Sequence, residues 1–236
     1  MQRSDWVFPL LVAATGATLL FMLPYVFLKV PTAQLAAGGA AQKIFYFHVP
    51  AAYAMYLCGV VCLVGSAAYL LKGTDRADAW ARAGAECAVV FGLMMITSGP
   101  LWARKAWGAY WSWDPRLTTT LLSVLIYVAI VMLRAFAGDG SAERRFAAAL
   151  GVLGTVNLPI IHYSVRKWGG NHPIVVTKGG GGLRNADMRT ALMVGFLAMT
   201  FIAIILLWQR ARVIHAHSRL ERVKHEALAS GIIDEL

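Results

Sequence analysis

The sequence is poor in charged residues. Charged side chains make up 14% of the 236 residues and hydrophobic side chains 58%, whereas soluble domains carry about 25% charged residues. This scarcity excludes a sizeable soluble domain, and several apolar runs of about 20 residues are long enough to cross a bilayer as helices. We therefore predict an all-α, polytopic integral membrane protein in which 1–236 form a single membrane domain of six transmembrane helices.

Cysteine is also scarce. The three cysteines, Cys58, Cys62 and Cys87, all lie within apolar runs, so they predict no disulfide framework and do not indicate a redox compartment. Cys58 and Cys62 share a helical face, but two thiols alone are a poor metal site, and free cysteine is usually buried. We predict that all three are small core residues.

Other expected signals are missing. No clear small-x-small cleavage site follows the first apolar run, which is too long for a signal-peptide core, so we predict a membrane helix that is kept in the mature chain. The glycines at 179–182 lack the Gly-Lys-Ser/Thr ending of a phosphate loop, which favours a flexible linker. There is no strong internal repeat or low-complexity domain, and we predict no nucleic-acid partner.

The apolar runs predict where the spans lie. They fall at about 7–28, 51–71, 85–101, 116–136, 146–163 and 188–208, and a basic tail follows at 209–236. Pro50 suits the first turn of the second span, and Ser98-Gly99-Pro100 is typical of a helix end. Six spans place both termini on one side of the membrane. The aromatic stretch described below, His48 and the loop containing His172 then share the other side.

Basic residues only weakly favour cytoplasmic termini. Twelve Lys and Arg lie on the terminal side and ten on the opposite side, and the positive-inside rule counts basic residues rather than net charge. Ten Asp and Glu lie on the terminal side and two on the opposite side, so the net charges of the two sides are +2 and +8. The side opposite the termini therefore has an unbalanced basic surface, which suits an anionic ligand or partner.

The densest feature is the stretch WGAYWSWDPRLT at 107–118. Four aromatics fall within seven residues: Trp107, Tyr110, Trp111 and Trp113. The first three would share one face of a helical turn. They predict either an interfacial aromatic belt or a flat platform for a large planar ligand, and both interpretations stay open. Asp114 followed by proline is typical of an N-cap, which would fix this stretch against the next helix.

Five polar residues near or inside the spans are possible functional positions. His48, expected just before the second helix, is either a structural or solvated histidine or a ligand. Asn157 is either functional or bonded to the carbonyl that Pro159 frees. Glu86 is expected at the entrance of the third helix, facing the loop. His215 and His217 lie in the basic tail on different helical sides, which favours a solvated or lipid-headgroup face over a metal site.

The pattern W-G-x-x-W-x-W-D-x-R-L-T resembles the tryptophan-rich "WWD" signature of the haem-handling membrane proteins of cytochrome c maturation. It is most similar to that of the small six-helix haem-delivery (haem exporter) protein C family. Tyr110 stands where tryptophan is expected, but a tyrosine ring can still stack. The resemblance covers nearly the whole chain in span number and motif order. It implies a multi-pass protein of the bacterial inner membrane with its haem site on the periplasmic side.

The resemblance also implies the site residues. His48, in a His-Val-Pro context, and His172, after Trp168, would be the two axial ligands of the haem iron. The cofactor-binding stretch would comprise Trp107, Tyr110, Trp111, Trp113, Asp114 and Arg116. The approach to His172 departs from the family pattern of adjacent tryptophans, so His162 is a reserve candidate for the second ligand. Arg116 is either a propionate partner or an ordinary interfacial arginine.

The implied function is not enzymatic. Such a protein would hold haem b transiently and present it to a periplasmic haem chaperone. An ABC transporter complex of ATPase, permease subunit and small single-helix protein would drive release of the loaded chaperone. Haem suits aromatic rings, imidazoles and excess Arg and Lys. The alternatives are a cytochrome c synthase-like enzyme, a transmembrane haem conduit, and a structural permease-like subunit.

Overall fold

The computed structural model describes residues 6–34, 38–138, 140–175, 182–183 and 185–231. Within them, six helices are long and apolar enough to cross a membrane, and no residue is in a strand. The prediction of an all-α polytopic protein with six spans is therefore confirmed. The helices are α1 (Val7–Pro24), α2 (Phe45–Lys72), α3 (Asp75–Trp107), α4 (Pro115–Phe136), α5 (Ser141–Trp168) and α6 (Ala186–Ala229). A π-helical turn, Tyr25–Lys29, continues α1, and a 3₁₀ turn, Gly39–Ile44, leads into α2.

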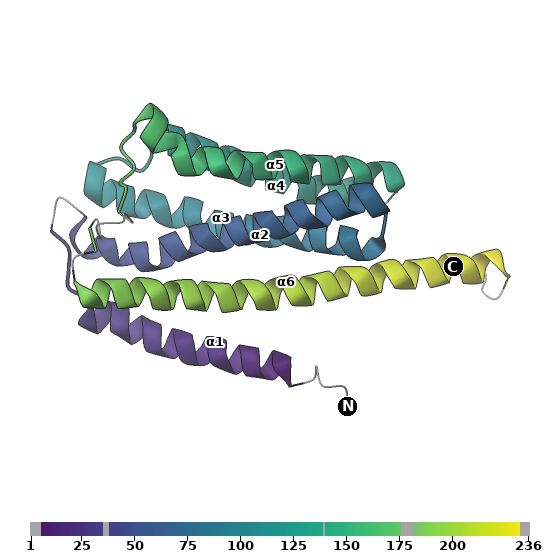
Figure 1. The fold of residues 1–236 in the computed structure, drawn as a ribbon, viewed down its shortest axis with the longest axis horizontal. Coiled ribbons are helices and arrows are strands. Elements are labelled where there is room, and N and C mark those ends of the chain that lie inside the picture. The colour runs from purple at the N-terminus through teal and green to yellow at the C-terminus, as the bar shows by residue number, and fades with distance from the viewer. Residues whose placement is uncertain (1–5, 35–37, 139, 176–181, 184, 232–236) are drawn as a thin grey trace.

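Helices α2 and α3 occupy the centre of the bundle. They pack extensively against each other, α4 and α5 pair on one side of them, and α6 contacts both from the other side (Figure 1). Helix α1 packs mainly against α6, at the edge of the bundle.

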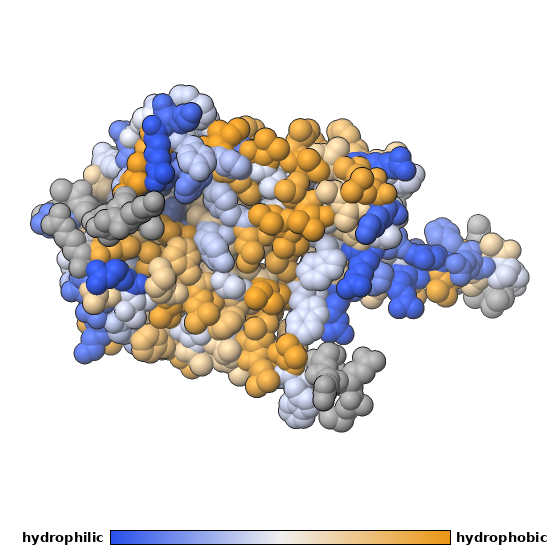
Figure 2. All heavy atoms as spheres, viewed as in Figure 1, coloured by the Kyte–Doolittle hydropathy of each residue, from blue (hydrophilic) through white to orange (hydrophobic). Residues whose placement is uncertain are grey.

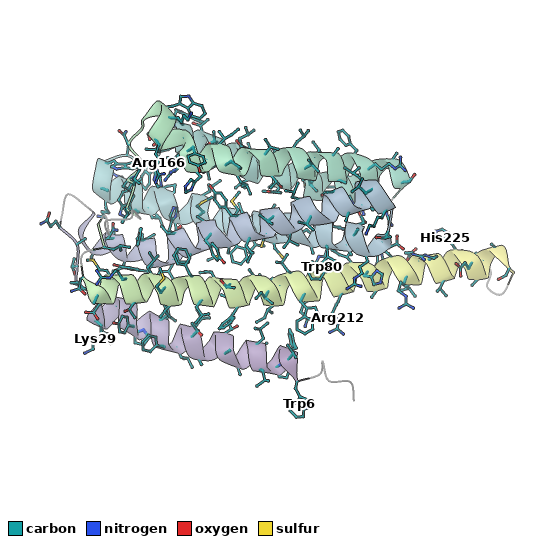
Figure 3. All side chains as sticks on the ribbon, in the orientation of Figure 1. Trp6, Lys29, Trp80, Arg166, Arg212 and His225 are labelled. Carbon is teal, nitrogen blue, oxygen red and sulfur yellow. The ribbon has the colours of Figure 1, made fainter. Side chains whose placement is uncertain are left out.

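The ends of the bundle match the expected alternation of loops. Figure 3 places Trp6, Arg212 and His225 toward one end and Lys29 and Arg166 at the other. Figure 2 shows polar residues gathered at both ends, with an apolar zone between them and a polar projecting end of α6. The assignment of the terminal end to the cytoplasm stays a prediction.

Pro50 and Pro100 do not mark the helix boundaries that the sequence predicts, a first turn at Pro50 and a helix end at Pro100. Helix α2 begins at Phe45 and contains Pro50, so His48 lies inside this helix and not before it. Helix α3 runs through Pro100 to Trp107 and ends at Gly108, which has a φ of 79°. Membrane helices tolerate proline where neighbouring groups satisfy or cover the freed backbone.

Helix α6 is held to α3 by an ion-pair network before its projecting end begins. The helix continues without a break from the predicted span 188–208 into the basic tail. Glu86 accepts from Arg82 Nε at 3.0 Å and from Arg210 Nη2 at 3.0 Å. The expectation that Glu86 faces a loop at a helix entrance is therefore wrong, because α3 already begins at Asp75.

Small residues allow α2 and α3 to approach closely. The three cysteines are free and buried in the main core cluster, as predicted. A Cβ placed on Gly84 would lie 2.5 Å from the backbone nitrogen of Cys62, and one on Gly65 would lie 2.4 Å from that of Ala81. Membrane helix pairs use such small residues because close backbone contact supplies their packing energy.

Buried polar side chains tie the remaining helices together. Asn157 donates to the carbonyl oxygen of Thr119 at 2.7 Å and to Ser123 Oγ at 2.8 Å, which joins α5 to α4. The Asn157 amide therefore bonds to α4 and not to the carbonyl freed by Pro159. Near the terminal end, Arg134 of α4 pairs with Asp78 of α3 at 2.8 Å. The linker predicted at 179–182 lies outside the described residues, except for Gly182.

Candidate functional site

A cavity of about 520 Å³ lies at the end of the bundle opposite the termini. It is lined by residues of α2, α3, α4, α5 and α6, and by the loops after α3 and α5. His48, His162 and His172 all line it, and so do Arg116 and Arg166. No Asp or Glu is among the described lining residues, so the two arginines give the cavity a positive field.

His48 is fixed on α2 by Ser98 of α3. Its Nδ1 lies 2.9 Å from Ser98 Oγ. The Ser98 hydroxyl also donates its hydrogen to the carbonyl oxygen of Met94 at 2.6 Å. A hydroxyl has one hydrogen, so Ser98 Oγ accepts from His48 Nδ1–H, and Nε2 keeps its lone pair.

Gly99 leaves room for the His48 ring. A Cβ on this glycine would lie 3.1 Å from His48 Cε1. The sequence Ser98-Gly99, which the sequence pattern predicts only as a helix end, therefore positions His48. The sequence signal for this role is a hydroxyl side chain next to a glycine inside an otherwise apolar span.

His172 lies in the loop after α5 and is anchored by Asp114. The backbone N–H of His172 donates to Asp114 Oδ2 at 3.0 Å, and the backbone N–H of Leu117 donates to Asp114 Oδ1 at 2.9 Å. The predicted N-cap role of Asp114 is therefore observed. The same carboxylate connects the start of α4 to the loop that carries His172. Asp114 is not itself a lining residue.

The His172 imidazole is neutral at physiological pH. Burial, followed by the positive charge of Arg116, lowers the pKa of His172 from 6.5 to about 4. Both effects disfavour the imidazolium ion. A neutral imidazole is the form that binds a metal.

Arg116 is held by the end of α5. Its Nε donates to the carbonyl oxygen of Ile161 at 3.3 Å, and its Nη2 donates to that of His162 at 3.0 Å. Its Nη1 lies 3.2 Å from His172 Nδ1. An arginine with these three contacts is an internal tie between α4, α5 and the loop, and no ion pair between it and a carboxylate is found among the described residues.

The aromatic stretch divides into two pairs. Trp107 and Trp111 line the cavity. Tyr110 and Trp113 do not, and they are 59% and 75% exposed. The expected single helical face does not form, because α3 ends at Trp107 and Gly108 turns the chain away. Tyr110 instead packs beside Arg104, whose guanidinium carbon lies 5.7 Å from the ring centroid.

Other aromatic residues of the cavity were not predicted from the sequence. Trp102 packs edge-on against Trp107, with ring centroids 5.2 Å apart, and its Nε1 donates to Gln42 at 2.8 Å. The other unforeseen aromatics are Tyr53, Tyr56 and Phe196. All four lie in apolar runs where aromatics are ordinary, so only the packing of helices around the cavity identifies them.

The cavity does not suit a metal ion held by protein ligands alone. Among the described residues, no group of three or more His, Cys, Asp or Glu could hold one. The imidazoles, tryptophan rings and arginines of the lining instead fit a planar macrocycle that brings its own metal and carboxylates.

Asp114 offers a test of this architecture. In the Asp114→Ala variant we expect amide exchange at 169–175 to rise about 10- to 100-fold, because a hydrogen bond to a charged group contributes about 1.5–3 kcal/mol. We also expect fraying of the first turn of α4, since a lost N-cap costs about 1 kcal/mol. Asp114→Asn is the matched control, because it retains an oxygen for Leu117 N–H but loses the acceptor for His172 N–H. Hydrogen-exchange mass spectrometry measures both segments, and unchanged exchange at 169–175 in the alanine variant would contradict the proposed anchor.

Comparison with known proteins adds family information. The family model described as "Heme exporter protein C" matches residues 1–226. A Bradyrhizobium diazoefficiens protein named "Heme exporter protein C" is 36% identical over 170 residues, which cover 71% of this chain and 64% of the relative. Proteins of the same name from Escherichia coli K12 and Rhodobacter capsulatus are 35% and 33% identical. These two alignments cover 57% and 71% of this chain, and 55% and 69% of the relatives.

The aligned part of the chain thus spans less than two thirds of the Bradyrhizobium and Escherichia relatives. The family model, by contrast, covers nearly the whole chain. On that match, the chain belongs to the Heme exporter protein C family.

Proposed function

We propose that the protein is a non-enzymatic haem carrier of cytochrome c maturation. It holds haem b transiently, with His48 and His172 as axial ligands, and presents it to a periplasmic haem chaperone. One observation carries this proposal: imidazoles from two separate elements line a single apolar cavity that also contains tryptophans and arginines and, among its described lining residues, no carboxylate.

The donor set fits haem. Each histidine has a partner at Nδ1, Ser98 Oγ for His48 and the carbonyl oxygen of Pro173 for His172. A hydrogen bond at one ring nitrogen orients an imidazole that binds metal through the other. Bound haem would supply the iron and four further nitrogen ligands. Two axial imidazoles would then leave no open iron position, which suits a carrier because an open position invites oxygen chemistry.

The other lining residues match the macrocycle and the propionates of haem. Trp107 and Trp111 provide apolar rings for the macrocycle. Arg116 and Arg166 provide positive charge for the two propionates, because arginine pairs well with carboxylates. Figure 3 shows Arg166 at the loop end of α5. Tyr110 and Trp113 are exposed beside the cavity, so we assign them to the approaching chaperone or to the membrane interface.

The setting of the site follows from topology. With both termini in the cytoplasm, the cavity lies at the periplasmic face of the bacterial inner membrane. The relatives are named exporters, which supports an ABC transporter complex with ATPase, permease and small single-helix subunits as partners. The basic end of α6 would lie on the ATPase side of the membrane.

The competing functions have less support. A transmembrane conduit requires polar or histidine side chains at mid-depth, and Asn157 already gives both amide hydrogens to α4. A purely structural subunit does not require three histidines and two arginines around one cavity. A haem-attaching synthase requires access for apocytochrome thiols, for which the described residues provide no separate domain.

The visible spectrum of purified protein supplied with haem tests the proposal. We expect a six-coordinate bis-imidazole spectrum in the wild type, and a five-coordinate spectrum or loss of haem in His48→Ala and in His172→Ala. His162→Ala is the matched control, because His162 lines the same cavity, and it should leave the spectrum unchanged. If His162→Ala disturbs the haem and His172→Ala does not, the second ligand is His162. If no sample binds haem, the carrier function is wrong.

A further inference from the structure

One atom of the cavity, Nδ1 of His172, has two neighbours with opposite requirements. It lies 3.2 Å from Arg116 Nη1 and 3.0 Å from the carbonyl oxygen of Pro173. A guanidinium can only donate a hydrogen bond and a carbonyl oxygen can only accept one. A neutral imidazole nitrogen either carries a hydrogen or has a lone pair, so His172 satisfies one neighbour at a time.

The two choices differ in whether His172 can bind a metal. With the hydrogen on Nδ1, the ring donates to Pro173 and its Nε2 lone pair is available. With the hydrogen on Nε2, Nδ1 accepts from Arg116, and Nε2 has no lone pair to give. The contact with Arg116 therefore favours the tautomer that cannot coordinate iron through Nε2.

His48 provides a contrast within the same cavity. Ser98 gives its single hydrogen to Met94, so it can only accept from His48 Nδ1–H. The contacts of Ser98 consequently favour the metal-binding tautomer of His48. His172 is held in that tautomer only when Arg116 is engaged elsewhere.

A carboxylate would engage Arg116 more strongly than the imidazole does. The neutral imidazole accepts one hydrogen bond from Arg116 through Nδ1, whereas a carboxylate carries the opposite charge and can accept two from one guanidinium. Arg116 also lines the cavity, and no carboxylate pairs with it among the described residues. A carboxylate brought by a ligand would therefore draw Arg116 Nη1 away from His172.

We propose that Arg116 is a positioning residue that makes the second axial bond depend on the carboxylates of the ligand. This inference rests on the proposed haem carrier function. Arg116 keeps His172 in the non-ligating tautomer until a ligand carboxylate takes the guanidinium. His172 would then donate through Nδ1 to the carbonyl oxygen of Pro173, after exchanging its Nε2 proton for one at Nδ1 through water, and Nε2 would be free to hold the iron. The protein thereby distinguishes a metal macrocycle with free carboxylates from one without them.

The test compares iron protoporphyrin IX with its dimethyl ester, in which both carboxylates are blocked. At saturation of the wild-type protein, we expect a six-coordinate spectrum with the free acid and a five-coordinate spectrum, through His48 alone, with the ester. In Arg116→Met, which cannot donate to His172, both porphyrins should be six-coordinate. Arg104→Met is the control, because Arg104 is not among the lining residues of the cavity, and it should keep the difference between acid and ester.

The readout is the coordination number of the iron at saturation. If Arg116 had a merely structural role, its substitution would change the affinity for both porphyrins and would keep the difference in coordination between acid and ester. A six-coordinate ester complex in the wild type overturns the proposal, even if Arg116→Met fails to fold. A five-coordinate ester complex in folded Arg116→Met also overturns it. If either result appears while His48→Ala and His172→Ala still lose an axial ligand, the carrier function stands and only the role of Arg116 is wrong.

Discussion

Gly84→Ala is expected to destabilise the folded protein by about 2–3 kcal/mol, the upper part of the usual range for overpacking. The added Cβ would lie 2.5 Å from the nitrogen and 2.8 Å from the Cα of Cys62. These are backbone atoms, so no side-chain rotation relieves the clash, and α2 and α3 must separate. Gly65→Ala should act similarly, because its Cβ would meet the backbone of Ala81.

The midpoint of detergent-induced unfolding, followed by helical circular dichroism, measures this effect. Gly16→Ala in α1 is the matched control, because a Cβ there meets no atom within 4 Å. It should leave stability unchanged or raise it by up to about 1 kcal/mol, since alanine favours helix more than glycine does. Equal midpoints for Gly84→Ala and Gly16→Ala would show that the close approach of α2 and α3 does not stabilise the bundle.

The effect should extend to the site. Helix α2 carries His48 and α3 carries Ser98, so separation of the two helices lengthens the 2.9 Å contact that fixes the imidazole. We therefore expect Gly84→Ala to broaden or weaken the haem spectrum, although Gly84 lies outside the cavity.

Asp78→Ala is the second change with a large expected effect. The Asp78 and Arg134 side chains are 6% and 2% exposed and lie 2.8 Å apart. Removing one member of a buried ion pair typically costs about 3–5 kcal/mol, because the remaining charge stays out of water. We expect a corresponding fall in the unfolding midpoint and reduced yield of folded protein.

Two controls separate burial from charge. Arg222 pairs with Asp75 but is 59% exposed, so Arg222→Ala should cost no more than about 1 kcal/mol. The double variant Asp78→Leu with Arg134→Met should be much less destabilised than Asp78→Ala, because it leaves no buried charge without its partner. If Asp78→Ala unfolds at the same midpoint as Arg222→Ala, the pair does not stabilise the junction of α3 and α4.

Both changes act on the central helix α3. This helix contacts α2, α4 and α6, and it contributes Trp102, Trp107 and Ser98 to the site or its immediate support. The length of α3 depends on its passing through Pro100, where the sequence predicts a helix end. The site is therefore one end of a continuous packed element and not a loop added to the bundle.

Some properties of this protein follow from the sequence alone. Apolar runs predict six spans because the length of a membrane crossing fixes the length of a helix. An even number of spans then brings the His48, aromatic and His172 segments to the same end. Asp114 before proline predicts the start of α4, because N-capping is a local interaction. Burial of the cysteines follows from their position in apolar runs.

Other properties depend on tertiary structure. A helix in lipid is apolar on nearly every side, so hydropathy does not tell the face that packs on protein from the face that meets lipid. Prolines inside α2 and α3 are tolerated because neighbouring helices cover the affected backbone, which no local pattern records. Local pattern also does not separate Trp107 and Trp111, which line the cavity, from Tyr110 and Trp113, which do not, because the packing of helices decides which rings face it.

The hydrogen-bond partners of the two histidines show most clearly what the sequence leaves open and the tertiary structure decides. The sequence names His48 and His172, but Ser98 and Arg116 are 50 and 56 residues away from them along the chain. The choice of ring nitrogen depends on which of these groups donates and which accepts. That choice is made by helix packing, because only the folded bundle brings the start of α4, the end of α5 and the His172 loop within hydrogen-bonding distance.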